Sequence, residues 1–207
     1  MSDSIWIYGA AGHAKVIIQA IRASGQSIGG VVDDDDERVG TTILDFTIQP
    51  TSEVPASVPI VIAIGNNGIR KRIFDHFEDR EPGRPWPRVI HPTAIIDPTV
   101  QLGDGVVVMA GSVIQADTVI GPQTIINTRS SIDHDVAVGS FSHVCPGATI
   151  AGHVSIGDLV MIGTGANVLP CQKIGNASTV GAGACVISEV PANTVFTGVP
   201  AREKKQC

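Results

Sequence analysis

Three histidines lie close together in the second half of the chain and are candidates for acid–base chemistry. They are His134, His143 and His153, and the first of them stands between two carboxylates, Asp133 and Asp135. A carboxylate beside an imidazole holds the ring in one tautomer and raises its basicity. Activation of an amine or a hydroxyl group requires a base that titrates near neutral pH. We therefore predict that His134 is a general base.

The sequence leaves open which of the two neighbouring carboxylates orients His134. In an extended strand successive side chains point to opposite faces, which would separate Asp135 from the ring of His134. Contact between them requires a local turn that breaks this alternation. Asp133 is the alternative partner.

A six-residue repeat in the sequence predicts the secondary structure that carries these histidines. From Ile90 to Val186 every sixth residue is Ile, Leu or Val, which makes seventeen positions without a miss. Neither the helical period of about 3.6 residues nor the strand period of two gives this pattern by itself. Three hexads would close one triangular coil of a β-solenoid, and coils would bury their apolar faces by stacking. We expect the small residue at the fifth hexad position inside the coil, and glycine at the second position to supply the backbone angles of a tight corner.

The first part of the chain predicts a different architecture, a small α/β unit. A strand at residues 5–8, a glycine turn at residues 9–13 and a helix over residues 14–23 form the opening of a Rossmann-like βαβ unit. The N-terminus of such a helix suits a phosphate, and an acid about 20 residues after the glycines suits a ribose. Asp33 has this spacing, directly after a second strand at residues 28–32. The GxGxxG fingerprint is absent, which disfavours a dinucleotide.

Short sequence patterns predict the remaining elements of this α/β unit and the position where it ends. A buried strand at residues 59–64 precedes a turn and an amphipathic helix over residues 69–79, whereas residues 41–58 show no clear period. The proline-rich segment 81–87 reads as a linker. We therefore predict two domains, residues 1–85 and residues 86–207, with the last residues from 190 onward capping the final coil.

Composition narrows the possible partners. The net charge is −6 and basic residues form no large cluster, so a nucleic-acid partner is disfavoured. No apolar run reaches the roughly 18 residues of a membrane span, and no signal-peptide pattern is present. The four cysteines form no CxxC pair and are expected to be reduced thiols in a cytoplasmic protein.

Motifs along nearly the whole chain carry a resemblance to a known family. They are Tyr8–His13, Val32–Asp34, Ile62–Asn67, Arg70–Lys71, Asn127–Thr128, Ile132–Asp135, Phe141–His143 and Gly198–Ala201. With its hexads, the chain resembles the left-handed β-helix acetyltransferases that act on nucleotide-linked amino sugars in bacterial glycan synthesis, a family that also includes sialic acid O-acetyltransferases. The resemblance implies a Rossmann-like domain followed by a left-handed parallel β-helix. It also implies a homotrimer that binds acetyl-CoA between neighbouring β-helices.

The resemblance implies roles for individual residues. His134 matches the general base, and Asp135 matches the acid that raises the pKa of that base, which is usually Glu in the family. Asn127 matches a residue that lines the acceptor site. The positions that match acetyl-CoA contacts are His143, Gly152, Thr164 and Ala182. The positions that match the pocket for the nucleotide end of the sugar, in residues 1–85, are Ala11, Gly12, His13, Asp33, Asp34, Gly65 and Asn66.

The predicted function is therefore acetyl-CoA-dependent N-acetylation of a nucleotide-linked amino sugar, by direct transfer and without a metal. An O-acetyltransferase acting on a sugar or sialic acid is the alternative; Asp33 and Asp34 favour N-acetylation because a free sialic acid would not need a nucleotide pocket. Two further alternatives are a non-catalytic binding protein and a zinc enzyme similar to the β-helical carbonic anhydrases. The anhydrases pair two histidine ligands five residues apart, whereas the spacings here are nine and ten.

Overall fold

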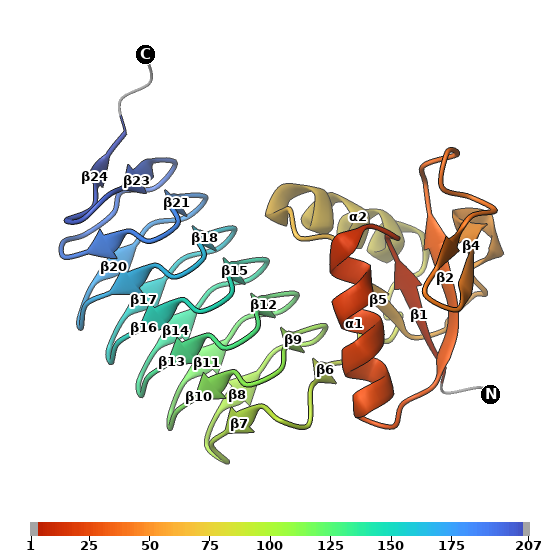
Figure 1. The fold of residues 1–207 in the computed structure, drawn as a ribbon, viewed down its shortest axis with the longest axis horizontal. Coiled ribbons are helices and arrows are strands. Elements are labelled where there is room, and N and C mark those ends of the chain that lie inside the picture. Colours follow the sequence, from red (N-terminus) through yellow and green to blue (C-terminus); the bar gives the residue numbers. More distant parts are fainter. Residues whose placement is uncertain (1–3, 205–207) are drawn as a thin grey trace. The chain divides into compact units, whose positions relative to one another are not determined.

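The computed structural model describes residues 4–204 and divides into two units (Figure 1). The N-terminal unit ends at Pro92 and the second begins at Thr93. The predicted linker, residues 81–87, has no helix or strand and belongs to the N-terminal unit, together with β6 (Val89–Ile90). Cys207, one of the four cysteines, lies outside the described residues.

The N-terminal unit is built on a five-stranded sheet with the order β3-β4-β2-β1-β5. Its elements are β1 (Ile5–Tyr8), α1 (Gly12–Ala23), β2 (Ile28–Asp33), β3 (Thr42–Ile43), β4 (Phe46–Pro50), η1 (Thr51–Glu53), β5 (Ile60–Ile62) and α2 (Asn67–Arg80). The strands β4, β2, β1 and β5 are parallel, which confirms the Rossmann-like arrangement. The apolar face of α1 is buried, and Ile73 of α2 packs with Tyr8, Val32, Ile60 and Ile62.

Residues 41–58, for which the sequence showed no clear period and only a weak strand with a loop was expected, contain a β-hairpin and one turn of 3₁₀ helix. β3 and β4 pair antiparallel around Leu44 and Asp45, and β4 then pairs in parallel with β2. Ile48 is buried through this pairing with β2, a contact between distant parts of the chain. A local sequence period could not reveal it, because the strands are too short to show alternation.

The second unit is a parallel β-helix of stacked triangular coils, as the hexads predicted, and it is left-handed, as the family resemblance implied (Figure 1). The first wall contains β7 (Ile95–Ile96), β10 (Val113–Ile114), β13 (Ser131–Ile132), β16 (Thr149–Ile150), β19 (Asn167–Val168) and β22 (Cys185–Val186). The second wall contains β8 (Gln101–Leu102), β11 (Val119–Ile120), β14 (Ala137–Val138), β17 (Ser155–Ile156) and β20 (Lys173–Ile174). The third wall contains β9 (Val107–Val108), β12 (Ile125–Ile126), β15 (His143–Val144), β18 (Met161–Ile162), β21 (Thr179–Val180), β23 (Val195–Thr197) and β24 (Arg202–Glu203). At its end β24 pairs antiparallel with β23, and Phe196 of β23 pairs with Val180, the last aliphatic anchor of the third wall.

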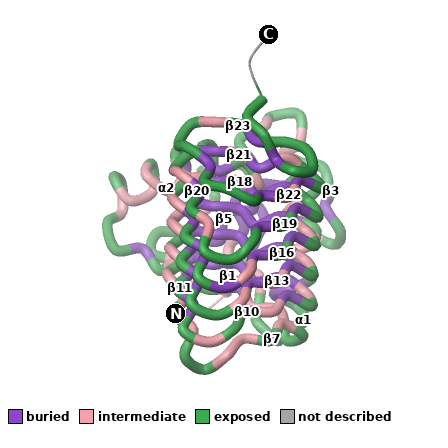
Figure 2. Tube along the Cα trace, turned by 90° about the vertical axis from the view of Figure 1, so that its left-hand side faces the viewer, coloured by how far each residue is buried: buried purple, intermediate pink, exposed green. Residues whose placement is uncertain are grey.

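The interior of the β-helix follows the hexad closely (Figure 2). The aliphatic anchors stack in register, so that Ile114 pairs with Ile132 and Ile132 with Ile150. Most fifth-position residues are buried as well, and hydroxyls such as that of Thr124 donate to a backbone carbonyl, here that of Gly139. Stacking therefore both buries the apolar face and satisfies the small polar groups inside it.

The predicted reason for the glycines at the second hexad position was wrong. A Cβ at Gly139 would lie 2.5 Å from the backbone carbon of Gly157, so glycine is needed there because the next coil passes so close. The left-handed backbone angles fall instead at the fourth hexad position, where Asp135 has φ of 56° and His153 has φ of 59°. Each corner thus places one residue, often not glycine, in a conformation that breaks strand alternation.

No helix among the described residues has both the length and the apolar character needed to cross a membrane.

Candidate active site

His134 and Asp135 occupy the turn between β13 and β14, at the corner where the first wall meets the second. The left-handed φ of Asp135 swings its carboxylate to the same side as the imidazole, and Oδ2 lies 2.7 Å from His134 Nδ1. The Asp133 carboxylate accepts instead from the backbone N–H of His134, at 2.9 Å. Asp135 therefore orients the ring, and Asp133 holds the backbone.

The next coil supplies the other neighbours of His134. Gly152 lies one coil further along, and a Cβ on it would come within 2.7 Å of His134 Cε1 and 2.8 Å of Nε2. The ring therefore lies directly against the Gly152 backbone. The backbone N–H of His153 donates to the His134 carbonyl, and the two imidazoles meet edge to face with centroids 5.2 Å apart.

The electrostatics of this corner suit a base. The hydrogen bond to Asp135 raises the pKa of His134, and the charges of Asp133 and Asp135 act in the same direction. With Nδ1 bound to the carboxylate, Nε2 carries the lone pair that can accept a proton. The side chain is 51% exposed, so an incoming substrate can reach it.

Apart from Gly152, the predicted acetyl-CoA and acceptor positions lie elsewhere on the same β-helix. Asn127, Thr164 and Ala182 follow β12, β18 and β21, at the corner between the third and first walls. The Asn127 amide lies 3.0 Å from His143 Nε2, and both side chains are buried. Of the residues predicted for acetyl-CoA, the structure brings only Gly152 to His134. His143, although close to His134 in the sequence, lies in β15 of the third wall, away from the His134 corner.

A resident metal ion does not fit this arrangement. His134, Asp135 and His153 place one ligand atom each within 4.8 Å of one another. However, His134 Nδ1 and Asp135 Oδ2 are only 2.7 Å apart, whereas two ligands of a tetrahedral zinc ion stand roughly 3.3 Å apart. His143, the third imidazole that the zinc alternative needs, contacts Asn127 on another wall.

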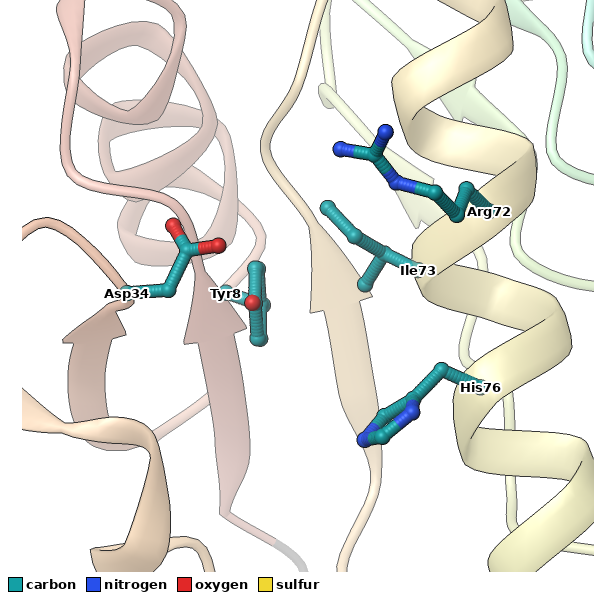
Figure 3. Close-up of a pocket in the computed structure, with 5 residues that line it drawn as sticks. All are labelled: Tyr8, Asp34, Arg72, Ile73 and His76. Carbon is teal, nitrogen blue, oxygen red and sulfur yellow. The ribbon is translucent and has the colours of Figure 1, made fainter.

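A second concentration of polar groups lies in the N-terminal unit, beside the carboxyl ends of β1 and β2 (Figure 3). Tyr8, Asp34, Arg72, Ile73 and His76 line a cavity of about 320 Å³. Burial, reinforced by the adjacent Asp34 carboxylate, raises the pKa of Tyr8 to about 12, so the phenol stays protonated and donates to Asp34. In parallel α/β sheets ligands bind at this end of the strands.

Several residues predicted for the nucleotide pocket build the turns around this cavity. Asp33 is buried, and its two oxygens accept from the backbone N–H groups of Ala10, at 2.5 Å, and Asp35, at 3.0 Å. Ala11 precedes α1, and Gly12 and His13 open it. Asp33 thus ties the turn that leads into α1 to the end of β2, while Asp34 faces the cavity.

Gly65 and Asn66 form the corresponding turn between β5 and α2. The Asn66 side chain caps α2 by accepting from the Ile69 N–H at 2.9 Å. Buried Arg70 donates to the carbonyls of Ile64 and Gly65, and burial lowers the pKa of its guanidinium to about 9, so it remains a cation at neutral pH. These contacts hold the turn in one conformation.

Sequence reasoning missed Tyr8, Arg72 and His76 as cavity residues. Arg72 and His76 stand four apart on α2 and so share one face of the helix, which was an available signal. Tyr8 is the last residue of β1, the position from which a side chain reaches a ligand at the end of a parallel strand. His153 was singled out only as a histidine, because its contact with Asp135 crosses from one coil to the next.

Comparison with known proteins yields matches over each part of the chain. Residues 4–77 match the family model described as PglD N-terminal domain. The chain is 37% identical over 113 residues to UDP-N-acetylbacillosamine N-acetyltransferase of Bacillus subtilis (strain 168). That alignment spans 52% of this chain and only about half, 51%, of the length of that relative.

Solved structures match over nearly the full length. A histidine-to-asparagine variant of perosamine N-acetyltransferase from Caulobacter crescentus, in complex with CoA and GDP-perosamine, is 34% identical with a TM-score of 0.90, covering 98% of this chain and 97% of the other. The acetyltransferase domain of PglB from Neisseria gonorrhoeae, in complex with acetyl coenzyme A, is 33% identical with a TM-score of 0.90, covering 99% of this chain and 100% of the other.

Proposed function

The chain belongs to the family of hexapeptide-repeat N-acetyltransferases with a PglD-type N-terminal domain, and from this premise we propose that it transfers the acetyl group of acetyl-CoA to the amine of a nucleotide-linked amino sugar. One observation carries the proposal above all. His134 Nδ1 lies 2.7 Å from Asp135, on an exposed corner, which leaves Nε2 ready to accept a proton. Relatives that bind CoA with an amino sugar linked to a nucleotide support the choice of substrates.

The proposed reaction is a direct transfer. His134 Nε2 takes a proton from the ammonium of the sugar, and the freed nitrogen lone pair attacks the thioester carbonyl. The carbon–sulfur bond then breaks, the nitrogen gives its second proton to the leaving CoA thiolate, and the proton held by His134 passes to solvent. Asp135 stabilises the imidazolium formed in the first step. No covalent enzyme intermediate is required, and burial raises the pKa of the Cys145 thiol to about 11, which makes it a poor nucleophile.

The oxyanion formed at the thioester carbon needs a hydrogen-bond donor close to His134. The N–H of Gly152 donates to no backbone carbonyl among the described residues, and the glycine touches the His134 ring. We assign it to the oxyanion, where a fixed backbone donor stabilises the charge that develops in the transition state.

A second copy of the chain completes the proposed site. His134 stands at the corner between the first and second walls, whereas the predicted acetyl-CoA residues Thr164 and Ala182 stand at the corner between the third and first walls. In a homotrimer, the His134 corner of one β-helix would lie against the Thr164 and Ala182 corner of its neighbour, with acetyl-CoA between the two β-helices. The three cysteines described are free thiols, which agrees with the proposed location in the cytoplasm.

The nucleotide end of the sugar is assigned to the N-terminal unit. The cavity beside Tyr8 and Asp34 has hydrogen-bonding groups for a base or ribose, and Arg72 adds a positive charge. The N-terminus of α1, at Ala11, Gly12 and His13, points backbone N–H groups toward a phosphate in the manner of related α/β folds.

The test is an acetyl-transfer assay on the purified full chain with a panel of nucleotide-linked amino sugars, following CoA thiol release and the acetylated product. We expect an N-acetylated product, and about a 100-fold or larger loss of kcat in His134→Ala. Near-normal kcat in this variant, with an unchanged oligomer, would remove His134 as the base. Acetylation of a hydroxyl of free sialic acid, without turnover of any nucleotide sugar, would favour O-acetylation instead.

A further inference from the structure

We propose that His153 is a positioning residue for the general base and shares the Asp135 carboxylate with His134. This inference rests on the proposed function of His134. It assigns a role to a ring from the following coil for which the matched motifs imply none.

A single carboxylate oxygen meets both imidazoles. Asp135 Oδ2 lies 2.7 Å from His134 Nδ1 and 3.7 Å from His153 Nε2. The rings are nearly perpendicular, at 85°, with their centroids 5.2 Å apart. The hydrogen bond from the His153 N–H to the His134 carbonyl, at 3.1 Å, fixes the spacing of the two turns.

This contact limits how His134 can turn. The Gly152 backbone lies against the ring at Cε1 and Nε2, and His153 meets it edge to face. With Nδ1 bound to Asp135, these neighbours leave the ring a narrow range of orientations. His153 therefore helps to aim Nε2, although it touches neither substrate nor thioester in the proposed reaction.

The contact also has an electrostatic consequence. A protonated imidazole at position 153 competes for Asp135 and repels a second proton on His134, so the two rings titrate as a coupled pair. The other titratable groups at this corner are Asp133, Asp117 in the preceding coil and Cys171 in the following coil. The carboxylates of Asp135 and Asp133 favour protonation of His134, whereas desolvation and a positive charge on His153 oppose it. His153 thereby keeps part of the base unprotonated in mildly acidic solution.

The decisive variant is His153→Asn in the full chain, measured as kcat/KM from pH 5.5 to 9. Asparagine accepts the left-handed backbone at this position, where φ is 59°, but cannot be protonated. We expect a lower plateau near pH 8.5, because the His134 ring is no longer held in one direction, and an acid limb moved up by about 0.5 pH units, which lowers the activity at pH 6 about threefold further. An unchanged profile, an acid limb moved to lower pH, or an equal loss at every pH would overturn the proposal.

A second readout needs no turnover. NMR titration of the histidine rings should show His134 taking up its proton at higher pH in His153→Asn than in the wild type. The matched control is Ala177→Asn, an exposed turn position with φ of 54° at a different corner, which should leave both readouts unchanged. If His153→Asn fails to fold, His153→Gly, which also tolerates this backbone, replaces it.

The two readouts separate the inference from the proposed function. Loss of the NMR coupling would overturn the inference even in an active enzyme. Acetyl transfer that survives His134→Ala would overturn the function while the coupling between the rings remains measurable.

Discussion

The N-terminal unit and the β-helix use their polar side chains in opposite ways. In the N-terminal unit Asp33 and Arg70 are buried and bound to backbone groups, and together they fix the turns around a cavity of about 320 Å³. At the β-helix corner the side chains of His134 and Asp135 are 51% and 45% exposed. The first region is a preformed recess, and the second is an open edge.

This difference predicts a division of labour. A recess with fixed walls recognises one ligand shape, because its contacts are already in place. An open corner excludes water only when substrate, acetyl-CoA or a second β-helix covers it, so its groups act mainly in the reaction itself. Substitutions in the recess should therefore change KM, and substitutions at the corner should change kcat.

Among substitutions that leave His134 itself in place, the largest effect at the corner is expected for Gly152→Ala. The added Cβ would lie 2.7 Å from His134 Cε1, so the ring must turn away from its present direction. We expect kcat to fall about 100-fold, because misplacing a catalytic group by about 1 Å has an effect of this size. The measurement is steady-state kinetics, with KM for the nucleotide sugar and the thermal unfolding temperature as controls. A variant with normal kcat would show that the His134 ring need not lie against the coil.

A smaller effect is expected for Asp135→Asn. Replacing the carboxylate by an amide removes the negative charge and weakens the hydrogen bond that raises the pKa of His134, so the pKa falls and the neutral base persists to lower pH. The acid limb of kcat/KM should move to lower pH, opposite to the shift expected for His153→Asn, and the plateau should drop about 10-fold because the base is weaker. Asp133→Asn is the matched control, since its side chain can still accept from the His134 N–H. Equal profiles for the two variants would contradict the assignment of Asp135 as the orienting acid.

The smallest effect is expected in the recess, for Asp34→Asn. The carboxylate accepts from Tyr8 and lines the cavity, and its replacement by an amide weakens one charge-assisted contact. We expect KM for the nucleotide sugar to rise about 5-fold with kcat unchanged, which corresponds to the typical value of one hydrogen bond. A fall in kcat at constant KM would contradict the proposal that the N-terminal cavity binds the substrate and the β-helix corner carries out the reaction.

The six-residue repeat allowed much of the β-helix to be predicted from the sequence. Anchors such as Ile114, Ile132 and Ile150 were expected inside, and they stack there in register. The fifth-position residues were also placed correctly. The prediction failed for the second-position glycines, because the reason for Gly139 is the backbone of the neighbouring coil, and no local pattern reports that distance.

The N-terminal unit was less accessible to sequence reasoning. Strands and helices with clear periods were recognised, but the hairpin of β3 and β4 was not, since Ile48 is buried only by pairing with β2. The spacing after the glycine turn singled out Asp33 as the acid for a ribose, and the family resemblance added Asp34. The fold gives them different roles. The Asp33 carboxylate accepts hydrogen bonds from backbone N–H groups, whereas the Asp34 side chain lines the cavity.

The sequence by itself determined the coil, because a strict six-residue period can be recognised without knowing which distant residues are in contact. It also determined the candidate base, because His134 stands between two acids in the chain. Tertiary structure decided which acid reaches the ring, through the left-handed backbone of Asp135, and it brought Gly152 and His153 beside the ring from the following coil. The physical reason is that periodicity is a local property of the chain. The direction of a side chain at a corner and its neighbours across stacked coils exist only after the coils have closed.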